Sequence, residues 1–157
     1  MNKLIYLLFC ISFSAVFAQN STRIFENVEI VEDLTLKITV SDGVYKIVPY
    51  SNTIVETTFI QNGEAVLKES HAVILKPKNI AISFKEKEDQ FVLKTDGIMV
   101  KVQKSPFQIQ YYYNNKLLIS EALGYVKNDS LEKIHFNIKS NEVLYGGGAR
   151  ALGMNRR

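Results

Sequence analysis

Apolar and polar residues alternate along most of this chain, in short runs that are separated by turn-forming residues. Between Ile98 and Gln103, for example, Ile98, Val100 and Val102 share one side of the run and the intervening residues share the other. An alternation with a period of two is typical of a β-strand with one buried face. No segment keeps a helical period, and turn signals return roughly every 8 to 12 residues. The sequence therefore predicts an all-β fold, an antiparallel β-sandwich or barrel, and the mixed second face of each strand favours two sheets packed face to face.

The expected strands are short and closely spaced, about a dozen in all. They cover residues 34–40, 44–50, 54–60, 65–75, 80–84, 91–94, 98–103, 107–113, 116–120, 125–126, 134–138 and 143–145. Asn62-Gly63 and Asp96-Gly97 are hairpin signals, and Pro49 near the end of its strand indicates a sheet edge or a bulge. The side chains expected between the two sheets are those of Ile38, Val100, Val102, Phe107, Ile109, Ile134 and Phe136.

The first 18 residues form a pattern of their own. Lys3 precedes an apolar run that ends in Val16-Phe17-Ala18, with small residues at the positions that a signal peptidase reads. We expect a signal peptide over residues 1–18, cleavage after Ala18, and a secreted or periplasmic domain over residues 19–157. Cleavage would also remove Cys10, the one cysteine of the chain, so that the mature domain would have no disulfide and would depend on an ordinary core.

Composition excludes some classes of partner and site. A net charge of +3 is too small, and too evenly spread, to favour nucleic acid as a partner. The two histidines, His71 and His135, have no neighbouring ligands at metal spacing, and no pair of carboxylates is marked as catalytic. The sequence thus predicts no catalytic residue, no metal site and no cofactor within this chain. Tyr111 and Tyr113 could form a platform on which a sugar stacks, but alternation places them on the Phe107 face and favours core packing.

A glycine-rich stretch follows the last expected strand. Tyr145 is followed by Gly146, Gly147 and Gly148, and then by Ala149 and Arg150. Glycine has no Cβ, so the backbone here can turn tightly or approach another group closely. We interpret this stretch as the boundary between this domain and a following one.

Three blocks of the sequence together resemble the N-terminal domain of glycoside hydrolase family 31, the α-glucosidase and α-xylosidase group. They are residues 44–56, residues 95–102 with 105–109, and residues 142–150. The first is similar to the strand-turn-strand with which that domain begins, and the second to a hairpin of the family. The third resembles the family's Tyr-Gly-x-Gly-Glu segment, except that Ala149 stands where the family usually has Glu.

The resemblance implies a galactose-mutarotase-like β-sandwich that packs against a (β/α)8 barrel. In that family the catalytic aspartates lie on the barrel, so none is carried over to this chain. The implied function is that of a non-catalytic N-terminal domain of a secreted retaining α-glycosidase that acts on oligo- or polysaccharides. The sandwich would support the barrel, which would be part of the same chain, and would shape the rim of its pocket. The residues that would lie at this rim are Tyr145, Gly146, Gly147, Gly148 and Arg150.

Two alternatives stay open at this stage. A free-standing carbohydrate-binding or adhesin-like β-sandwich would also be exported, all-β and rich in tyrosine, and a purely structural interaction domain fits the composition as well. The reading frame downstream of the codon for Arg157 would distinguish a domain of a longer enzyme from a free-standing module.

Overall fold

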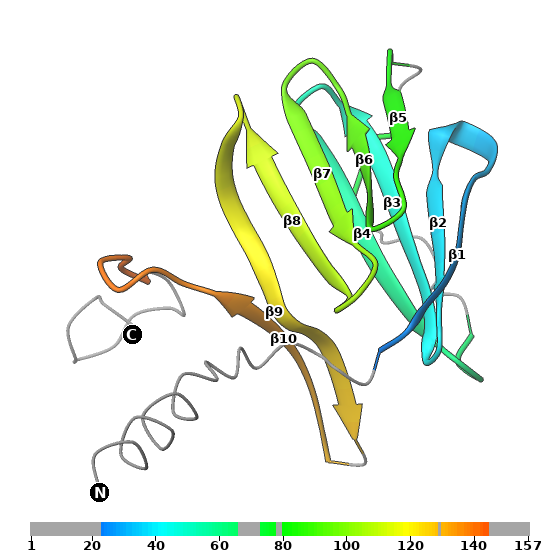
Figure 1. Cartoon of the computed structure of the whole chain (residues 1–157), viewed down its shortest axis with the longest axis vertical. Helices are drawn as coiled ribbons and strands as arrows, with labels where there is room; N and C mark the ends of the chain where they lie inside the picture. The colour runs from blue at the N-terminus through cyan, green and yellow to red at the C-terminus, as the bar shows by residue number, and fades with distance from the viewer. Residues whose placement is uncertain (1–22, 66–72, 78–79, 129, 145–157) are drawn as a thin grey trace, which may run out of the picture.

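The computed structural model describes residues 23–65, 73–77, 80–128 and 130–144, which form two antiparallel sheets packed face to face (Figure 1). The first sheet has four strands in the order β1-β2-β3-β4, and the second has six in the order β10-β9-β8-β7-β6-β5. Within each sheet every strand therefore pairs with its neighbours in the sequence, whereas β4 and β5 lie in different sheets. The strands of the first sheet are β1 (Phe25–Ile30), β2 (Leu36–Val40), β3 (Gly43–Ser51) and β4 (Ile54–Gln61), with a short 3-10 helix, η1 (Glu32–Leu34), between the first two. Those of the second are β5 (Ser83–Glu86), β6 (Gln90–Lys94), β7 (Ile98–Gln103), β8 (Gln108–Tyr113), β9 (Lys116–Asn128) and β10 (Leu131–Asn137).

The core lies between the central strands of the two sheets. Every second side chain of β2 and β3 points inward, and so do those of β6 and β7, as the alternation in the sequence predicts. On β8, Ile109 is buried in the core and Tyr111 packs against it, but Gln108 is buried as well. The prediction of an antiparallel β-sandwich is therefore confirmed. The buried apolar side chains are Leu36, Ile38, Val40, Tyr45, Ile47, Phe91, Leu93, Val100, Val102, Phe107 and Ile109.

Two of the side chains expected in the core are exposed instead. Ile134 is 57% exposed and Phe136 is 42% exposed, although both lie on the inner face of β10. The first sheet has four strands against six in the second, and it ends at β4. Figure 1 shows β9 and β10 extending away from the four-stranded sheet. The alternation thus placed these side chains on the correct face, but among the described residues no strand of the first sheet covers them.

Several strand boundaries differ from the expected ones. Strand β1 was not expected, because it is an edge strand with a register shift and its sequence FENVEI does not alternate regularly. Leu34 lies in η1 with a φ of 59°, and β9 is one continuous strand where two short ones were expected. Two expected strands, 65–75 and 143–145, are not seen. Their described residues, 65, 73–75 and 143–144, are not in strands, and their other residues lie outside the described part of the chain. The bulge at Pro49 is confirmed, because the register of β3 and β4 shifts between Pro49 and Ser51.

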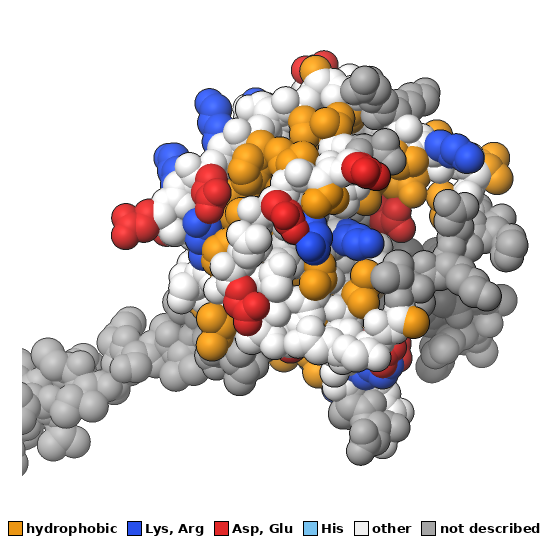
Figure 2. Space-filling model, turned by 90° about the vertical axis from the view of Figure 1, so that its right-hand side faces the viewer, with side chains coloured by type: hydrophobic (Ala, Val, Ile, Leu, Met, Phe, Trp, Pro, Cys, Tyr) orange, Lys and Arg blue, Asp and Glu red, His pale blue; other side chains and the backbone are white. Residues whose placement is uncertain are grey.

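The side of the molecule that carries β1 and β5 has a mixed surface. In Figure 2 charged side chains of both signs are interspersed there with hydrophobic ones. Among the described ion pairs, Lys37 Nζ lies 2.7 Å from Glu29 Oε1, and Lys104 Nζ lies 2.7 Å from Glu86 Oε1. Exposed pairs of this kind contribute little to stability but keep a surface soluble. Within the described residues, no helix is long and apolar enough to cross a membrane.

Candidate functional site

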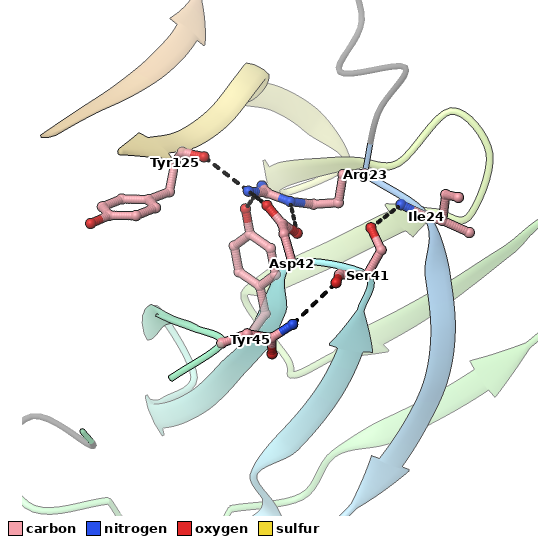
Figure 3. Close-up of polar contacts among 7 residues, drawn as sticks. Arg23, Ile24, Ser41, Asp42, Tyr45 and Tyr125 are labelled. Atoms are coloured by element: carbon pink, nitrogen blue, oxygen red, sulfur yellow. Dashed lines mark hydrogen bonds and ion pairs between the residues drawn. The ribbon is translucent and has the colours of Figure 1, made fainter. Parts of the chain in front are cut away.

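A buried arginine lies where the first sheet meets β9. Arg23 comes just before β1 and is only 6% exposed. Its Nε donates a hydrogen bond of 2.7 Å to Asp42 Oδ1, and its Nη2 donates one of 2.6 Å to Asp42 Oδ2 (Figure 3). Asp42 lies in the turn between β2 and β3. Two parallel hydrogen bonds of this kind are the strongest interaction that an arginine makes with a carboxylate. The positive charge of the buried Arg23 is therefore compensated by Asp42.

The same guanidinium also holds the two sheets together. Its Nη1 donates to the hydroxyl of Tyr45 on β3, and its Nη2 donates to the backbone carbonyl of Tyr125 on β9 at 2.9 Å (Figure 3). Its Cζ lies 5.2 Å from the ring centroid of Tyr45 and 4.5 Å from that of Phe59. A cation over an aromatic face is attracted by the ring quadrupole. Arg23 thus connects strands of both sheets through one planar group.

Glu121 is the second buried ionisable group of this region. It lies on β9, is 6% exposed, and its Oε1 is 3.4 Å from the hydroxyl of Tyr111, which lies 2.8 Å from Thr57 Oγ1. Burial raises the pKa of the Glu121 carboxyl to about 7, although the Arg23 guanidinium and the Tyr111 hydroxyl oppose this effect. Burial, followed by the charge of Glu121, also raises the pKa of Tyr45 and of Tyr111, so both hydroxyls remain protonated near neutral pH.

Gly124 allows β9 to pass close to these groups. It has a φ of +63°, and the register of β9 and β10 shifts beside it, between His135 and Phe136. A Cβ built on Gly124 would lie 2.6 Å from Glu121 Oε2 and 2.9 Å from the Tyr45 hydroxyl. The left-handed backbone conformation therefore favours glycine at this position, and a Cβ would also have to displace the ends of these two side chains.

A cleft of about 280 Å³ opens beside this cluster, between β4 and the pair β9–β10. Its walls are mostly apolar, and its polar groups belong to Thr57, Tyr111, Glu121 and the two other tyrosines. The residues that line it are Tyr45, Val55, Thr57, Phe59, Tyr111, Ile119, Glu121, Tyr125, Ile134 and Phe136.

The cleft contains a single carboxyl group among its lining residues, that of Glu121. Retaining glycoside hydrolysis needs two carboxyl groups about 5 Å apart. Asp42 is held by Arg23, and no group of three His, Cys, Asp or Glu side chains within the described residues could hold a metal ion.

Most of the residues that the sequence predicted at a site fall outside the part of the chain that the structure describes. Tyr145, Gly146, Gly147, Gly148 and Arg150, like His71, are outside the described residues. His135 is half-buried on β10, opposite Gly124. Tyr111 packs against the core as expected, whereas Tyr113 is 42% exposed, contrary to its expected place on the core face.

The second block of the family resemblance has a structural role. Thr95 is buried, and its Oγ1 donates a hydrogen bond of 2.7 Å to the carbonyl of Asn52 while accepting one of 3.0 Å from the amide of Ile98. A Cβ on Gly97 would lie 2.6 Å from the same Asn52 carbonyl. Thr95 and Gly97 therefore join the β6–β7 turn to the β3–β4 turn.

Sequence reasoning missed Arg23, Glu121 and Gly124. Arg23 precedes β1, whose sequence does not alternate regularly, and Glu121 lies in a mostly apolar run that resembles an ordinary strand. The sequence signal for this cluster was the presence of Glu121 and Gly124 within an apolar run. This signal is weak, because it does not show which side chains of the opposite sheet would surround the carboxylate.

Replacing Glu121 by Gln should make the domain more stable at pH 8 but not at pH 4. The folded protein keeps the Glu121 proton up to about pH 7, whereas the unfolded chain loses it near the ordinary value of 4.5. Between these values unfolding releases a proton, so the free energy of unfolding falls as pH rises, and the loss is complete above about pH 7. A glutamine side chain at this position would stay neutral throughout, and we expect a gain of up to about 3 kcal/mol above pH 7.

Urea denaturation at several pH values measures this difference. The exposed Glu88→Gln variant is the matched control and should show no such gain. A Glu121→Gln variant that is equally stable relative to wild type at pH 4 and pH 8 would show that the carboxyl is not desolvated.

Comparison with known proteins agrees with this fold. Residues 44–157 match the model of the glycosyl hydrolase 31 N-terminal galactose mutarotase-like domain. Over 81 residues, which are 51% of this chain and 10% of the relative, the sequence is 35% identical to Alpha-glucosidase 2 of Bacillus thermoamyloliquefaciens.

Solved structures share the architecture. The GH31 dextranase of Flavobacterium johnsoniae complexed with glucose has a TM-score of 0.73 at 21% identity, over 90% of this chain and 18% of the dextranase chain. A mutant of that dextranase complexed with isomaltotriose gives the same values. The chain thus spans a tenth to less than a fifth of the length of these relatives. The family model covers most of this chain. The chain therefore belongs to the glycosyl hydrolase 31 N-terminal galactose mutarotase-like domains.

Proposed function

We propose that this chain is the non-catalytic N-terminal domain of a secreted retaining α-glycosidase, and that it supports a catalytic (β/α)8 barrel and shapes the rim of its pocket. One observation carries the proposal: the chain belongs to a domain family of glycoside hydrolases, yet its cleft offers one carboxyl where hydrolysis needs two. The chemistry would then belong to another part of the polypeptide.

The lengths of the relatives support a separation between this non-catalytic domain and a catalytic part of the polypeptide. The chain matches 10% of the alpha-glucosidase and 18% of the dextranase chain, so most of each relative lies outside the region of similarity. We propose that the corresponding polypeptide acts on an oligo- or polysaccharide. The glycine-rich stretch from Tyr145 to Arg150 would approach the substrate pocket, because a backbone without Cβ atoms can come close to another group.

Export is part of the same proposal. Residues 1–18 have the basic start, apolar run and small residues of a cleaved signal peptide. The working protein would therefore begin at Gln19 and act in the periplasm or outside the cell.

The test compares residues 19–157 with the longer exported polypeptide, whose first residue should be Gln19. We expect no hydrolysis of aryl α-glycosides by residues 19–157 and clear hydrolysis, with retention of configuration, by the longer protein. In the longer protein, Gly147→Val should lower kcat/KM by about tenfold or more, because a small displacement at a pocket rim is costly for the reaction. The Gly147→Ala variant adds a smaller group and should lose less.

The melting temperature should change less than the activity in both variants. Turnover by residues 19–157 alone would contradict the non-catalytic role. Full activity of the Gly147→Val enzyme would contradict the role of this stretch at the pocket rim.

A further inference from the structure

The outer face of the six-stranded sheet, opposite the core, carries lysines but no acidic residue on the four strands β5 to β8. These strands lie side by side (Figure 1). Their inner face packs on the core through side chains such as Phe84, Leu93 and Val100, so the alternate residues point outward. We define the basic face by six of these outward side chains: Lys85, Lys94, Met99, Lys101, Gln110 and Tyr112.

The strand register brings the three lysines of the basic face close together. Lys85 and Lys101 pair with Val92 from its two sides, so their backbones are roughly 10 Å apart, which is twice the distance between strands. Lys94 lies diagonally from each of them, at roughly 7 to 8 Å. Among the described ion pairs, none includes any of these three lysines. Like charges at this spacing repel one another, and a bound polyanion would offset the repulsion.

The acidic residues of the same strands and turns lie away from the basic face. Glu86 is on the core side of β5, where its Oε1 is 2.7 Å from Lys104 Nζ. Asp89 and Asp96 are in the turns at the two ends of β6. The net charge of only +3 therefore does not describe this face, on which the fold gathers positive charge alone.

Polar side chains in fixed positions accompany the lysines. The Tyr112 hydroxyl donates a hydrogen bond of 2.9 Å to Gln110 Oε1, and Gln110 Nε2 donates one of 3.0 Å to Gln108 Oε1. Both groups keep further capacity for hydrogen bonds, since an amide nitrogen has two N–H groups and a phenol oxygen also accepts. Met99, which pairs with both Lys94 and Tyr112, adds apolar surface. This combination suits a sugar ring, which has C–H faces and hydroxyl edges.

We infer that the basic face binds an acidic polysaccharide, with the carboxylates of its sugar acids against Lys85, Lys94 and Lys101 and its hydroxyls against Gln110 and Tyr112. Charge complementarity selects the acidic polymer. The row of hydrogen-bonding side chains favours a polysaccharide over a lipid surface, which would use the lysines alone. The inference goes beyond the proposed function, because binding at this face requires no catalytic residue.

Binding measurements on the exported protein at its natural length test the inference. Polygalacturonate, a polymer of a sugar acid, is the probe, and dextran of similar length is the neutral comparison. We expect polygalacturonate to bind at least about tenfold more tightly than dextran, and its affinity to fall about tenfold or more when NaCl rises from about 50 to about 500 mM, because salt screens exposed charges.

A pair of double variants places the binding on this face. Lys94→Gln with Lys101→Gln should weaken polygalacturonate binding about tenfold or more, whereas Lys94→Arg with Lys101→Arg should keep it within about threefold, because arginine retains the charge. The matched control is Lys37→Gln with Lys46→Gln, which removes two charges that lie opposite one another on the first sheet. It should change the affinity by less than about twofold, and the melting temperature of every variant should stay within about 3 °C of the wild type.

The outcomes separate this inference from its alternatives. No binding of polygalacturonate at low salt, or equal binding of dextran, would overturn it. Equal losses in the two glutamine variants would show that the polymer binds by net charge and not at this face. Tighter binding to vesicles of phosphatidylglycerol than to polygalacturonate would make the basic face a membrane contact, and the inference would be wrong. Absence of α-glycosidase activity would contradict the proposed function alone.

Discussion

A Val100→Asp variant should lose about 4 kcal/mol or more of its free energy of unfolding, a large part of the roughly 5 to 15 kcal/mol that stabilises an ordinary domain. Val100 lies on β7, is 1% exposed, and pairs with Leu93 on one side and Tyr111 on the other. A carboxylate there would lie in the apolar core between the sheets, where no described cation is adjacent to it. An unpaired charge is too costly to keep in such a place, so the protein must either protonate the group or open the core.

The control for this variant is on the same strand. Met99→Asp makes a comparable change at the next residue, whose side chain points to the other face and is only half-buried. We expect it to cost about 1 kcal/mol, since the charge can remain in water. Urea denaturation measures both values from the shift of the midpoint at an unchanged slope. Equal losses in the two variants would mean that Val100 does not face the core.

Replacing Gly124 by Ala should cost about 4 kcal/mol, although alanine adds only one methyl group. The φ of +63° at this residue is a left-handed conformation that costs an L-residue about 1 to 2 kcal/mol. The new methyl would also lie 2.6 Å from Glu121 Oε2 and 2.9 Å from the Tyr45 hydroxyl, so it would displace the buried cluster. Overpacking of this kind costs a further 1 to 3 kcal/mol, roughly.

Gly63 offers a matched control for the backbone contribution. Its φ is +83°, and a Cβ built on it would have no atom within 4 Å. Gly63→Ala should therefore lose only the cost of the left-handed backbone, about 1 kcal/mol. The difference between the two variants in thermal or urea unfolding measures the packing around Glu121 and Arg23. If both variants lose the same amount, the space around Gly124 is not limiting.

Local patterns in the sequence were sufficient to predict most of the described strands and the faces of their side chains. The side chain period of a strand is two, so Ile38, Val100 and Ile109 could be assigned to the core before any partner was known. Turn chemistry was equally local: Asn114-Asn115, an expected turn, has positive φ at both residues, and Asp96-Gly97 joins the paired strands β6 and β7 as its hairpin signal predicts. Gly63 has a φ of +83°, but among the described residues β4 pairs with β3 alone, so the hairpin expected at Asn62-Gly63 is not seen. Pro49 marked a bulge because proline cannot continue a ladder of hydrogen bonds.

Strand β1 was missed because an edge strand with both faces partly exposed has no strong periodicity. The burial of Ile134 and Phe136 was wrong for a different reason. Their alternation determines the face on which they lie, but the width of the opposite sheet determines whether that face is covered.

The family relationship was also accessible from the sequence, because its three blocks are local motifs, and the match over residues 44–157 confirms it. In the second block, the hydrogen bond of Thr95 to the Asn52 carbonyl explains why the motif contains this threonine. The expected pocket-rim residues from Tyr145 to Arg150 stay a prediction.

Only the tertiary structure decided that Arg23, Asp42 and Tyr45 would meet the β9 segment that contains Glu121 and Gly124. These groups come from separate parts of the chain, and their contact depends on how two sheets are stacked. The pKa of Glu121 follows from the same contact, because desolvation is a property of everything packed around a group. The sequence by itself therefore determined most of the strands and the faces of their side chains, since those choices depend on neighbours along the chain. The buried cluster, the cleft and the exposure of Ile134 and Phe136 were decided by the tertiary structure, since they depend on which of the described strands lie opposite one another.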